Sequence, residues 1–399
     1  MTTAYLSHLR PVVALLLLGV IAFLTENFGS VSRITLGRGI DKNSLNNGPW
    51  SGAAPRIDVN ELPRWIQDYV EFHNQSIAQK NTSSLRYMIY TCRKGHHCSG
   101  TGNRQRGIVA AFLVSILTKR IFLMDIDNPI PLDQVLEPHM IRWNKIPENL
   151  DKHSPPPIYD VRNKQPNPLQ RPGDFDTGQQ VIRILATGPG GLETIWNSTE
   201  MKELLAQTDK HMPPVIYKWL FYTLFKPSQA LQELVQRQRA SLGLTTFSDP
   251  YIGIHVRLGG GGAWRGHNEQ RYNVSTLPRF LQLGQQLRES HSGNLPLVII
   301  SDDAKAKELL YEMDPKSVRF VSNTTIVHVD RSKNGDNGVD GSLQVWADVL
   351  LLAQATCLVE SLSSFSSLAR RISISEHESM RCSVRQDEGM LLQWKQYWK

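Results

Sequence analysis

Residues 85–127, LRYMIYTCRKGHHCSGTGNRQRGIVAAFLVSILTKRIFLMDID, decide the fold class. The run LRYMIYTC is β-like, and a loop rich in glycine and polar residues, KGHHCSGTGNRQRG, follows it. The apolar stretch IVAAFLVSILTK is typical of a buried helix, and RIFLMDID is a second β-like run. A strand, a glycine loop, a helix and a strand in this order form one βαβ unit, so the stretch predicts an α/β sheet.

The same pattern returns in the second half of the chain. PYIGIHVRLG, PLVIISDD and VRFVSN predict strands, and LPRFLQLGQQLRES, AKAKELLYEM and SLQVWADVLLLAQA predict helices between them. LVESLSSFSSLARRIS then predicts a strand, a serine turn and a helix. We therefore expect two Rossmann-like α/β domains facing a central cleft, over residues 85–245 and 246–399, which suits the length of 399 residues.

Composition narrows the class of protein. Hydrophobic residues make up 40% of the chain and charged residues 20%, which excludes wholesale disorder. The net charge of +7 suits a phosphate-bearing ligand, but no block of Lys and Arg is dense enough to indicate nucleic acid. Residues 150–175 are rich in proline and predict a loop, while apolar residues at helical spacing predict a helix over 58–80.

The amino terminus indicates the secretory pathway. Residues 11–24 form an uninterrupted apolar run, shorter than the roughly 20 residues that span a bilayer. We interpret residues 1–28 as a cytoplasmic tail with a signal-anchor, or as a cleaved signal peptide, and residues 29–84 as a stem and first helix. A buried core helix is the alternative, which the terminal position disfavours. The expected location is the Golgi or endoplasmic reticulum lumen, with a single-pass type II membrane anchor or, after cleavage, secretion.

Sequons and cysteines fit a lumenal location. Five N-x-S/T triplets occur in the chain, at Asn74, Asn81, Asn197, Asn273 and Asn323. There are four cysteines, too few for a disulfide scaffold or a zinc ribbon. In an oxidising lumen, Cys92 and Cys98 could close a small loop, with Cys357 and Cys382 either buried as thiols or paired.

The residues suited to chemistry lie where predicted strands end. Open α/β sheets bind ligands beyond the carboxyl ends of their strands. Arg257 ends one such strand, and its guanidinium suits a diphosphate; a surface ion pair is the alternative. Because strand residues alternate, His255 points the same way as Arg257. Asp302 ends the next predicted strand.

Three further motifs have both functional and structural interpretations. Gly102, Asn103 and Arg104 open a helix after a strand, which suits an anion but also a tight turn. Ser363, Ser364 and Phe365 precede a helix with two arginines and form either a second anion site or a plain N-cap. The D-x-D at residues 125–127 could bind a divalent cation and a nucleotide diphosphate, or could simply stabilise the fold.

Four segments, in order, resemble one enzyme family. YIGIHVRLG resembles the H-x-R motif of the GDP-fucose-dependent superfamily of α1,6-fucosyltransferases and protein O-fucosyltransferases. ADVLLLAQATCLVESLSSFSSLARR resembles the motif in which an aspartate is followed by S-S-F sixteen residues later. The segments SGTGNRQRGIVAAFLVSILTKRIFLMD and ISDD resemble the family's Gly-Asn-Arg region and Ser-Asp strand end. Together these segments span roughly residues 85–385.

The resemblance implies a GT-B fold and an inverting, metal-independent transfer of L-fucose from GDP-fucose, with no cofactor. The acceptor would be a protein Ser/Thr or a glycan hydroxyl, bound by the amino-terminal domain, with the donor on the carboxyl-terminal one. Arg257 would hold the β-phosphate of the leaving GDP. The other expected donor-site residues are Gly102, Asn103, Arg104, His255, Asp302, Asp348, Ser363, Ser364 and Phe365, with Asp348 toward the guanine or ribose.

The sequence departs from the family at two positions. Thr101 stands where some members carry a catalytic glutamate, and Leu258 follows Arg257 where the α1,6 enzymes have a second arginine. The residue that deprotonates the acceptor is therefore not identified by the resemblance, and His267 and Glu269 are the candidates. A metal-dependent transferase that uses the D-x-D, an inactive nucleotide-sugar- or glycan-binding protein, and a lumenal adhesion or structural protein are the alternatives.

Overall fold

A computed structural model of the chain describes ten stretches within residues 52–399, which form one compact unit. The stretches are 57–79, 84–150, 158–161, 168–187, 195–206, 213–259, 272–291, 293–322, 338–373 and 382–385. The predicted leader, most of the predicted stem, Asn81, Asn323, His267 and Glu269 lie outside them. Among the described residues, no helix combines the length and the apolar character needed to cross a bilayer.

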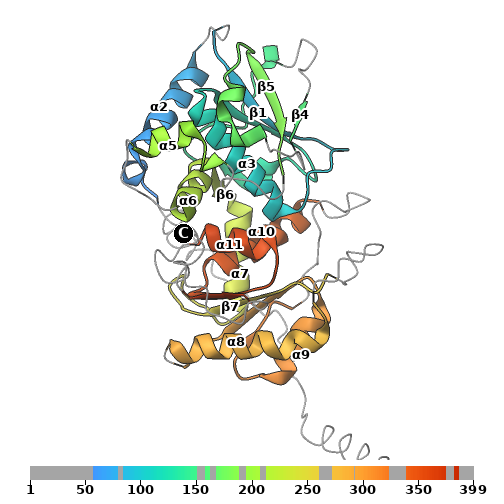
Figure 1. The fold of residues 1–399 in the computed structure, drawn as a ribbon. Coiled ribbons are helices and arrows are strands. Elements are labelled where there is room, and N and C mark those ends of the chain that lie inside the picture. Colours follow the sequence, from blue (N-terminus) through green and yellow to red (C-terminus); the bar gives the residue numbers. More distant parts are fainter. Residues whose placement is uncertain are drawn as a thin grey trace, which may run out of the picture. The chain divides into compact units, whose positions relative to one another are not determined.

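The first sheet is parallel, with the strand order β2-β1-β5-β4 (Figure 1). Its strands are β1 (Tyr87–Cys92), β2 (Ile121–Ile126), β4 (Ile158–Asp160) and β5 (Val181–Leu185). Every residue of β1 is buried, as expected for a central strand covered on both faces. Helices α2 (Arg64–Ala78) and α3 (Thr101–Leu117) pack on β1 and β2 through their apolar side chains.

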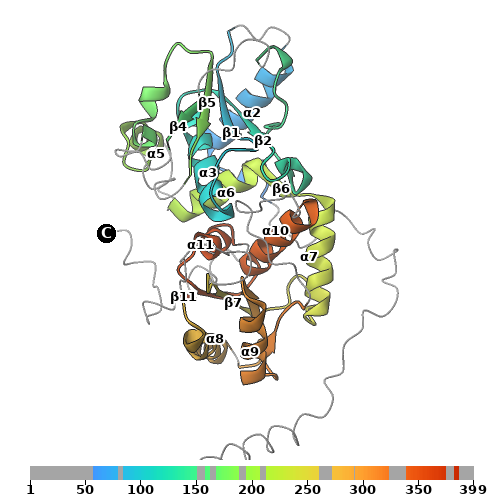
Figure 2. The same ribbon diagram turned by 90° about the vertical axis from the view of Figure 1, so that its right-hand side faces the viewer.

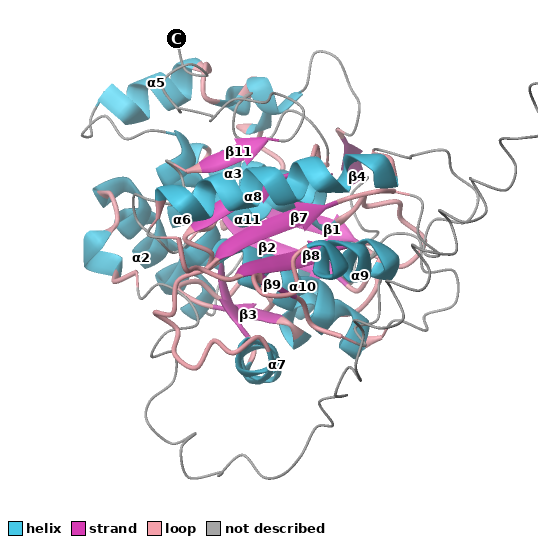
Figure 3. Ribbon diagram, turned by 90° about the horizontal axis from the view of Figure 1, so that it is seen from below, coloured by secondary structure: helices cyan, strands magenta, loops and turns pink. Residues whose placement is uncertain are grey.

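The second sheet is also parallel, with the order β11-β10-β7-β8-β9. These strands are β7 (Ile252–Val256), β8 (Leu297–Ser301), β9 (Val318–Arg319), β10 (Cys357–Glu360) and β11 (Ser383–Arg385). Helices α8 (Leu277–Ser290) and α9 (Ala304–Met313) cover one face of this sheet, and Figure 3 shows the molecule from that side. Helices α10 (Val339–Ala353) and α11 (Ser364–Arg371) lie on the other face (Figures 1 and 2).

A helical segment connects the two sheets. It contains α5 (Thr199–Ala206), α6 (Pro213–Leu224), β6 (Phe225–Pro227), which pairs antiparallel with β3 (Leu136–Pro138), and α7 (Gln229–Ser241), which packs on α10. Tyr222 of α6 donates a hydrogen bond to the carbonyl oxygen of Ile372, and the Arg371 guanidinium lies over the ring of Tyr217. The end of α11 is thereby tied to α6. Short 3₁₀ helices occur at Val59–Glu61, Leu132–Gln134, Glu148–Leu150, Pro168–Gln170, Pro172–Phe175 and Val274–Thr276.

The predicted α/β class with two parallel sheets is confirmed. Residues 150–175, predicted as a proline-rich loop, contain the three-residue strand β4 and two short 3₁₀ helices, which are too short to give a periodic apolar pattern. Each parallel sheet takes its strands from one side of residue 245, while α7, which precedes that residue, packs on α10. The domain boundary itself stays a prediction. Both cysteine pairs are disulfides, Cys92–Cys98 and Cys357–Cys382, so Cys357 is not a thiol.

Candidate functional site

Three neighbouring strands of the second sheet bring polar side chains to one edge. Arg257 directly follows β7, Asp302 follows β8, and Ser363 comes three residues after the end of β10. These strands are adjacent and parallel in the order β10-β7-β8, so their carboxyl ends meet at the same edge. This is the edge at which open α/β sheets bind ligands.

Arg257 and Asp302 are held in different ways. The half-buried Arg257 donates from Nη1 to Oγ of Ser363, at 3.4 Å. The carboxylate of Asp302 accepts hydrogen bonds from the backbone N–H of Leu258 at 2.9 Å and of Gly259 at 3.1 Å. Burial raises the pKa of Asp302, while these two amides and the charge of Arg257 oppose the rise. Asp302 therefore holds the backbone that follows Arg257, and its negative charge partly balances the positive charge of the Arg257 guanidinium.

His255 packs against the serine-rich turn that follows β10, at residues 361–365. Its side chain is 4% exposed, with Nδ1 2.8 Å from the Ser361 hydroxyl oxygen and the ring stacked on Phe365 at 5.2 Å between centroids. Burial, and then the charge of Arg257, lowers the pKa of His255 to about 3. The imidazole is therefore neutral at pH 7. As strand alternation predicts, His255 and Arg257 contact the same turn.

The first turns of α3 and α11 touch at Gly102. A Cβ atom on Gly102 would lie 2.2 Å from the carbonyl oxygen of Ser364 and 2.9 Å from the nitrogen of Phe365, so only glycine permits this approach. Neither first turn contains an acidic residue. Ser363 caps α11 by accepting from the N–H of Phe365 at 3.2 Å, while Gly100 begins α3 without a side-chain cap.

These features define what we call the cradle: the Arg257 side chain together with the first turns of α3 and α11. A helix N-terminus carries about half a positive charge, and here two of them meet beside a guanidinium. Such an arrangement is poorly stable on its own and is stabilised by an anion, because N-terminal amides and Arg both donate to phosphate oxygens. The cradle therefore has the chemistry of a phosphate site.

Asn103 and Arg104 differ in what they contact. Asn103 is half-buried in the first turn of α3, next to Gly102 at the cradle. Arg104 is buried and binds backbone carbonyls of its own half, donating from Nη1 to Asn128 and from Nη2 to Ser99 at 3.3 Å. Arg104 therefore braces the loop that precedes α3.

Asp348 belongs to a separate polar cluster. Its carboxylate accepts from Nε2 of Gln344 at 2.7 Å, and Gln344 accepts in turn from Nε2 of Gln238 on α7 at 2.7 Å. Burial raises the pKa of Asp348 to about 6, although the nearby Lys307 ammonium and the Gln344 hydrogen bond oppose the rise. The two hydrogen bonds link α10 with α7, and a role of Asp348 toward the nucleotide stays a prediction.

Both carboxylates of the D-x-D motif, Asp125 and Asp127, already bind other groups of the protein. The Asp125 carboxylate lies 2.6 Å from Nε of Arg93 and 2.7 Å from Nη1 of the buried Arg183. Asp127 accepts from the backbone N–H of Lys94 at 2.6 Å. Two guanidiniums on one carboxylate already compensate its charge, so the arrangement favours the structural interpretation of this motif.

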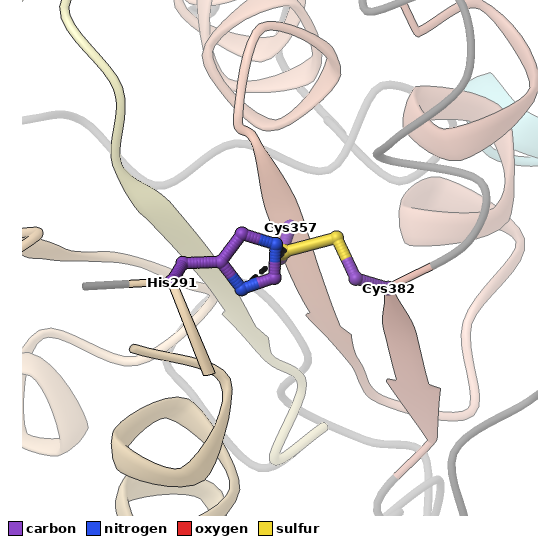
Figure 4. A group of neighbouring side chains, drawn as sticks. All are labelled: His291, Cys357 and Cys382. Atoms are coloured by element: carbon purple, nitrogen blue, oxygen red, sulfur yellow. Dashed lines mark hydrogen bonds between the residues drawn. A yellow bond between two sulfur atoms is a disulfide. The ribbon is translucent and has the colours of Figure 1, made fainter. Parts of the chain in front are cut away.

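One group of metal-ligand types is found among the described residues, at His291, Cys357 and Cys382 (Figure 4). Cys357 and Cys382 form a disulfide, and Nε2 of His291 lies 3.4 Å from Sγ of Cys357. Sulfur atoms bonded to each other are not thiolates, and thiolates are what a metal needs from cysteine. In the oxidised protein this group therefore fits a packed disulfide.

Two residues at the edge escaped the sequence-based prediction. Ser361 binds His255, and the Tyr272 hydroxyl accepts from the backbone N–H of Leu362 at 3.0 Å. Ser361 stands in the serine-rich turn, where its proximity to Ser363 was a usable signal. Tyr272 had none, because it comes from a segment far from the turn in sequence.

Comparisons with known proteins bear on the fold. No family model matches the sequence, and no curated protein matches it. An arginine-to-lysine mutant of Arabidopsis thaliana FUT1, solved in complex with GDP, is similar in structure, with a TM-score of 0.56 and 14% identity over 77% of this chain and 76% of that chain. Fucosyltransferase NodZ from Bradyrhizobium has a TM-score of 0.44 and 15% identity over 72% of this chain and 93% of that chain. The similarity to the FUT1 structure shows that the chain has a GT-B-like fold, as predicted.

Proposed function

We propose that this chain is an inverting, metal-independent glycosyltransferase that transfers L-fucose from GDP-fucose to a protein Ser/Thr or glycan hydroxyl. The cradle is the observation that carries the proposal. It joins a guanidinium and two helix N-termini at the sheet edge where nucleotides bind in open α/β folds. The ordered family-like motifs, and the similarity in fold to a GDP-bound FUT1, support GDP-fucose as the donor.

The proposed chemistry follows from the charges at the cradle. As the bond from C1 of fucose to the diphosphate oxygen breaks, negative charge develops on the departing GDP and positive character develops on the sugar. Arg257 and the N-terminal amides of α3 and α11 stabilise the diphosphate, and they act most strongly when its charge is greatest. A metal is then not required for the leaving group.

His255 has an indirect part in this proposal. A neutral imidazole stacked on Phe365 adds no charge of its own but fixes the turn that places Ser363 beside Arg257. Gly102 and Asn103 approach the donor from α3, and Asp302 holds the backbone after β7. The acceptor base would be His267 or Glu269, which lie outside the described residues.

The proposed compartment is the lumen of the Golgi or endoplasmic reticulum, with residues 1–28 as membrane anchor or signal. The two disulfides support this location, since disulfides persist in oxidising compartments.

Donor turnover tests the proposal. Purified protein is incubated with GDP-fucose in excess EDTA, and release of GDP is measured with and without candidate acceptors. We expect turnover in EDTA, and its loss in Arg257→Ala with the fold retained by circular dichroism. Turnover that requires added Mn²⁺ or Mg²⁺, or a folded Arg257→Ala protein with near-wild-type activity, would overturn the proposal.

A further inference from the structure

Three of the five sequons lie in the part of the chain that the structure describes, at Asn74, Asn197 and Asn273. In such a triplet the glycan is attached to the side-chain nitrogen of the asparagine, and the Ser or Thr two residues later belongs to the recognition signal. The motif therefore works where both side chains are accessible, typically in a surface loop. The three sequons differ in this respect.

The sequon at Asn273 lies in an exposed turn before α8. Asn273, Val274 and Ser275 are all exposed. The side-chain oxygen of Asn273 accepts a hydrogen bond from the backbone N–H of Ser275 at 3.3 Å, and its backbone oxygen accepts from the Thr276 hydroxyl at 2.6 Å. Within the described stretches, the hydrogen bonds of the Asn273 side chain and carbonyl thus use oxygen atoms. The nitrogen Nδ2 is left for a glycan.

The sequon at Asn197 is also accessible. Asn197 lies in the turn before α5, Thr199 is the first residue of that helix, and both are exposed. The middle residue, Ser198, is buried, and its hydroxyl accepts from the backbone N–H of Met201 at 3.1 Å. Ser198 therefore holds the turn, while the asparagine and the threonine of the sequon remain exposed.

The sequon at Asn74 differs in both of its recognised side chains. Asn74 lies within α2, and its Nδ2 donates to the carbonyl oxygen of Met140 at 2.9 Å, which ties the helix to the segment after β3. Ser76, the third residue of this sequon, is only 3% exposed. A glycan on Asn74 would compete with a tertiary contact, on a sequon whose hydroxyl is buried.

We infer that Asn197 and Asn273 carry N-linked glycans, in preference to Asn74. The inference rests on the lumenal compartment of the proposed function. The donor is a glycan linked to a lipid diphosphate. The bond from Nδ2 to the anomeric carbon forms, and the bond from that carbon to the diphosphate breaks. The nitrogen gives up one of its two protons, and the lipid diphosphate leaves.

A glycan at Asn273 is compatible with the local fold and adjoins the rim of the cradle. Attachment to Nδ2 leaves Oδ1 in place, so the hydrogen bond from the Ser275 N–H is kept. An N-linked glycan is bulky and hydrophilic, and here it stands beside Val274, an apolar side chain that is 44% exposed. The preceding residue, Tyr272, binds the backbone of the serine-rich turn. The glycan therefore covers apolar surface next to the candidate site.

Mass spectrometry of the full chain tests this assignment. The protein is produced in a eukaryotic secretory host, once with its own amino terminus and once with an established signal peptide fused in front. Glycans are removed with peptide-N-glycosidase F in heavy-oxygen water, which leaves a labelled aspartate at each glycosylated position. Peptide mass spectrometry should find the label at Asn197 and Asn273, and less label at Asn74 than at either.

Substitutions of the third sequon residue provide matched controls. Ser275→Ala destroys the triplet but leaves Asn273 and its hydrogen bond to the backbone in place, whereas Ser275→Thr preserves the triplet. The alanine variant should lose one glycan, seen as a step in gel mobility, and the threonine variant should keep it. Thr199→Ala and Thr199→Ser form the same pair for Asn197.

Two results would overturn the inference. One is an unlabelled Asn197 or Asn273 in the protein that carries the added signal peptide. The other is labelling of Asn74 equal to or above that of either site. Failure of the proposed compartment gives a different result, because the chain with its own amino terminus would then carry no glycan while the version with the added signal peptide would carry both.

Discussion

Replacing Gly102 with alanine tests whether the contact between α3 and α11 shapes the anion site. The new Cβ would lie 2.2 Å from the Ser364 carbonyl oxygen, and real Cβ atoms essentially never come closer than 3.0 Å to such an atom. Both neighbouring atoms belong to backbone, so no flexible side chain can give way. The first turns of the two helices must therefore separate by about 1 Å, a displacement that costs roughly 100-fold in rate when it moves reacting groups.

The expected stability loss for Gly102→Ala is about 1–3 kcal/mol, as for other overpacked sites, measured by urea unfolding. The Kd for GDP, measured by isothermal titration calorimetry, should rise at least about tenfold, since the phosphates lose contact with one helix N-terminus. Gly178→Ala is the matched control, because its Cβ would have no atom within 4 Å. A Gly102→Ala protein with wild-type stability and GDP affinity would refute the reasoning.

Three further variants test electrostatic statements. His255→Phe should flatten the pH dependence of the free energy of unfolding. In the wild type the pKa of His255 is about 3 in the folded state and 6.5 in the unfolded state, so its contribution to stability is full above pH 6.5 and falls by about 5 kcal/mol toward pH 3. Urea unfolding at a series of pH values across this range measures the difference. Asp348→Asn should become more stable relative to the wild type as the pH rises from about 4 through 6, by up to ~3 kcal/mol. The raised pKa of Asp348 means that its ionisation is unfavourable in the folded state, and the variant avoids that ionisation. Equal profiles of stability against pH for the two proteins would contradict this. Asp125→Asn should lose ~3–5 kcal/mol of stability by leaving Arg183 buried beside a neutral group, while turnover per folded molecule in EDTA stays unchanged. Loss of turnover in the folded variant would instead support the D-x-D mechanism.

The sequence predicted the sheets well because their strands are buried on both faces. Continuous apolar runs such as those in β1 and β7 are unambiguous, and the Leu277–Ser290 helix has the predicted bounds. The helix after β1 begins at Thr101, next to Gly102, Asn103 and Arg104, which were expected to open it, although the continuous apolar run that indicates the helix begins only at Ile108. β4 and β11 are three residues long, too short for periodicity to reveal.

Of the candidate site, the sequence predicted the parts that depend on local order along a strand or at its end. His255 and Arg257 share a face because strand residues alternate, and Ser363 is a cap because serine accepts from an N-terminal amide. It could not predict that Asp302 binds the backbone N–H of Leu258, because this contact depends on which segments meet in three dimensions.

The most direct test of the central claim compares GDP with GMP on wild-type and Arg257→Ala proteins by isothermal titration calorimetry. If Arg257 grips the β-phosphate, the wild type should prefer GDP by about 10- to 100-fold, the value of charged hydrogen bonds to one phosphate, and the variant should bind both nucleotides nearly equally. An unchanged preference for GDP in folded Arg257→Ala protein would contradict the account.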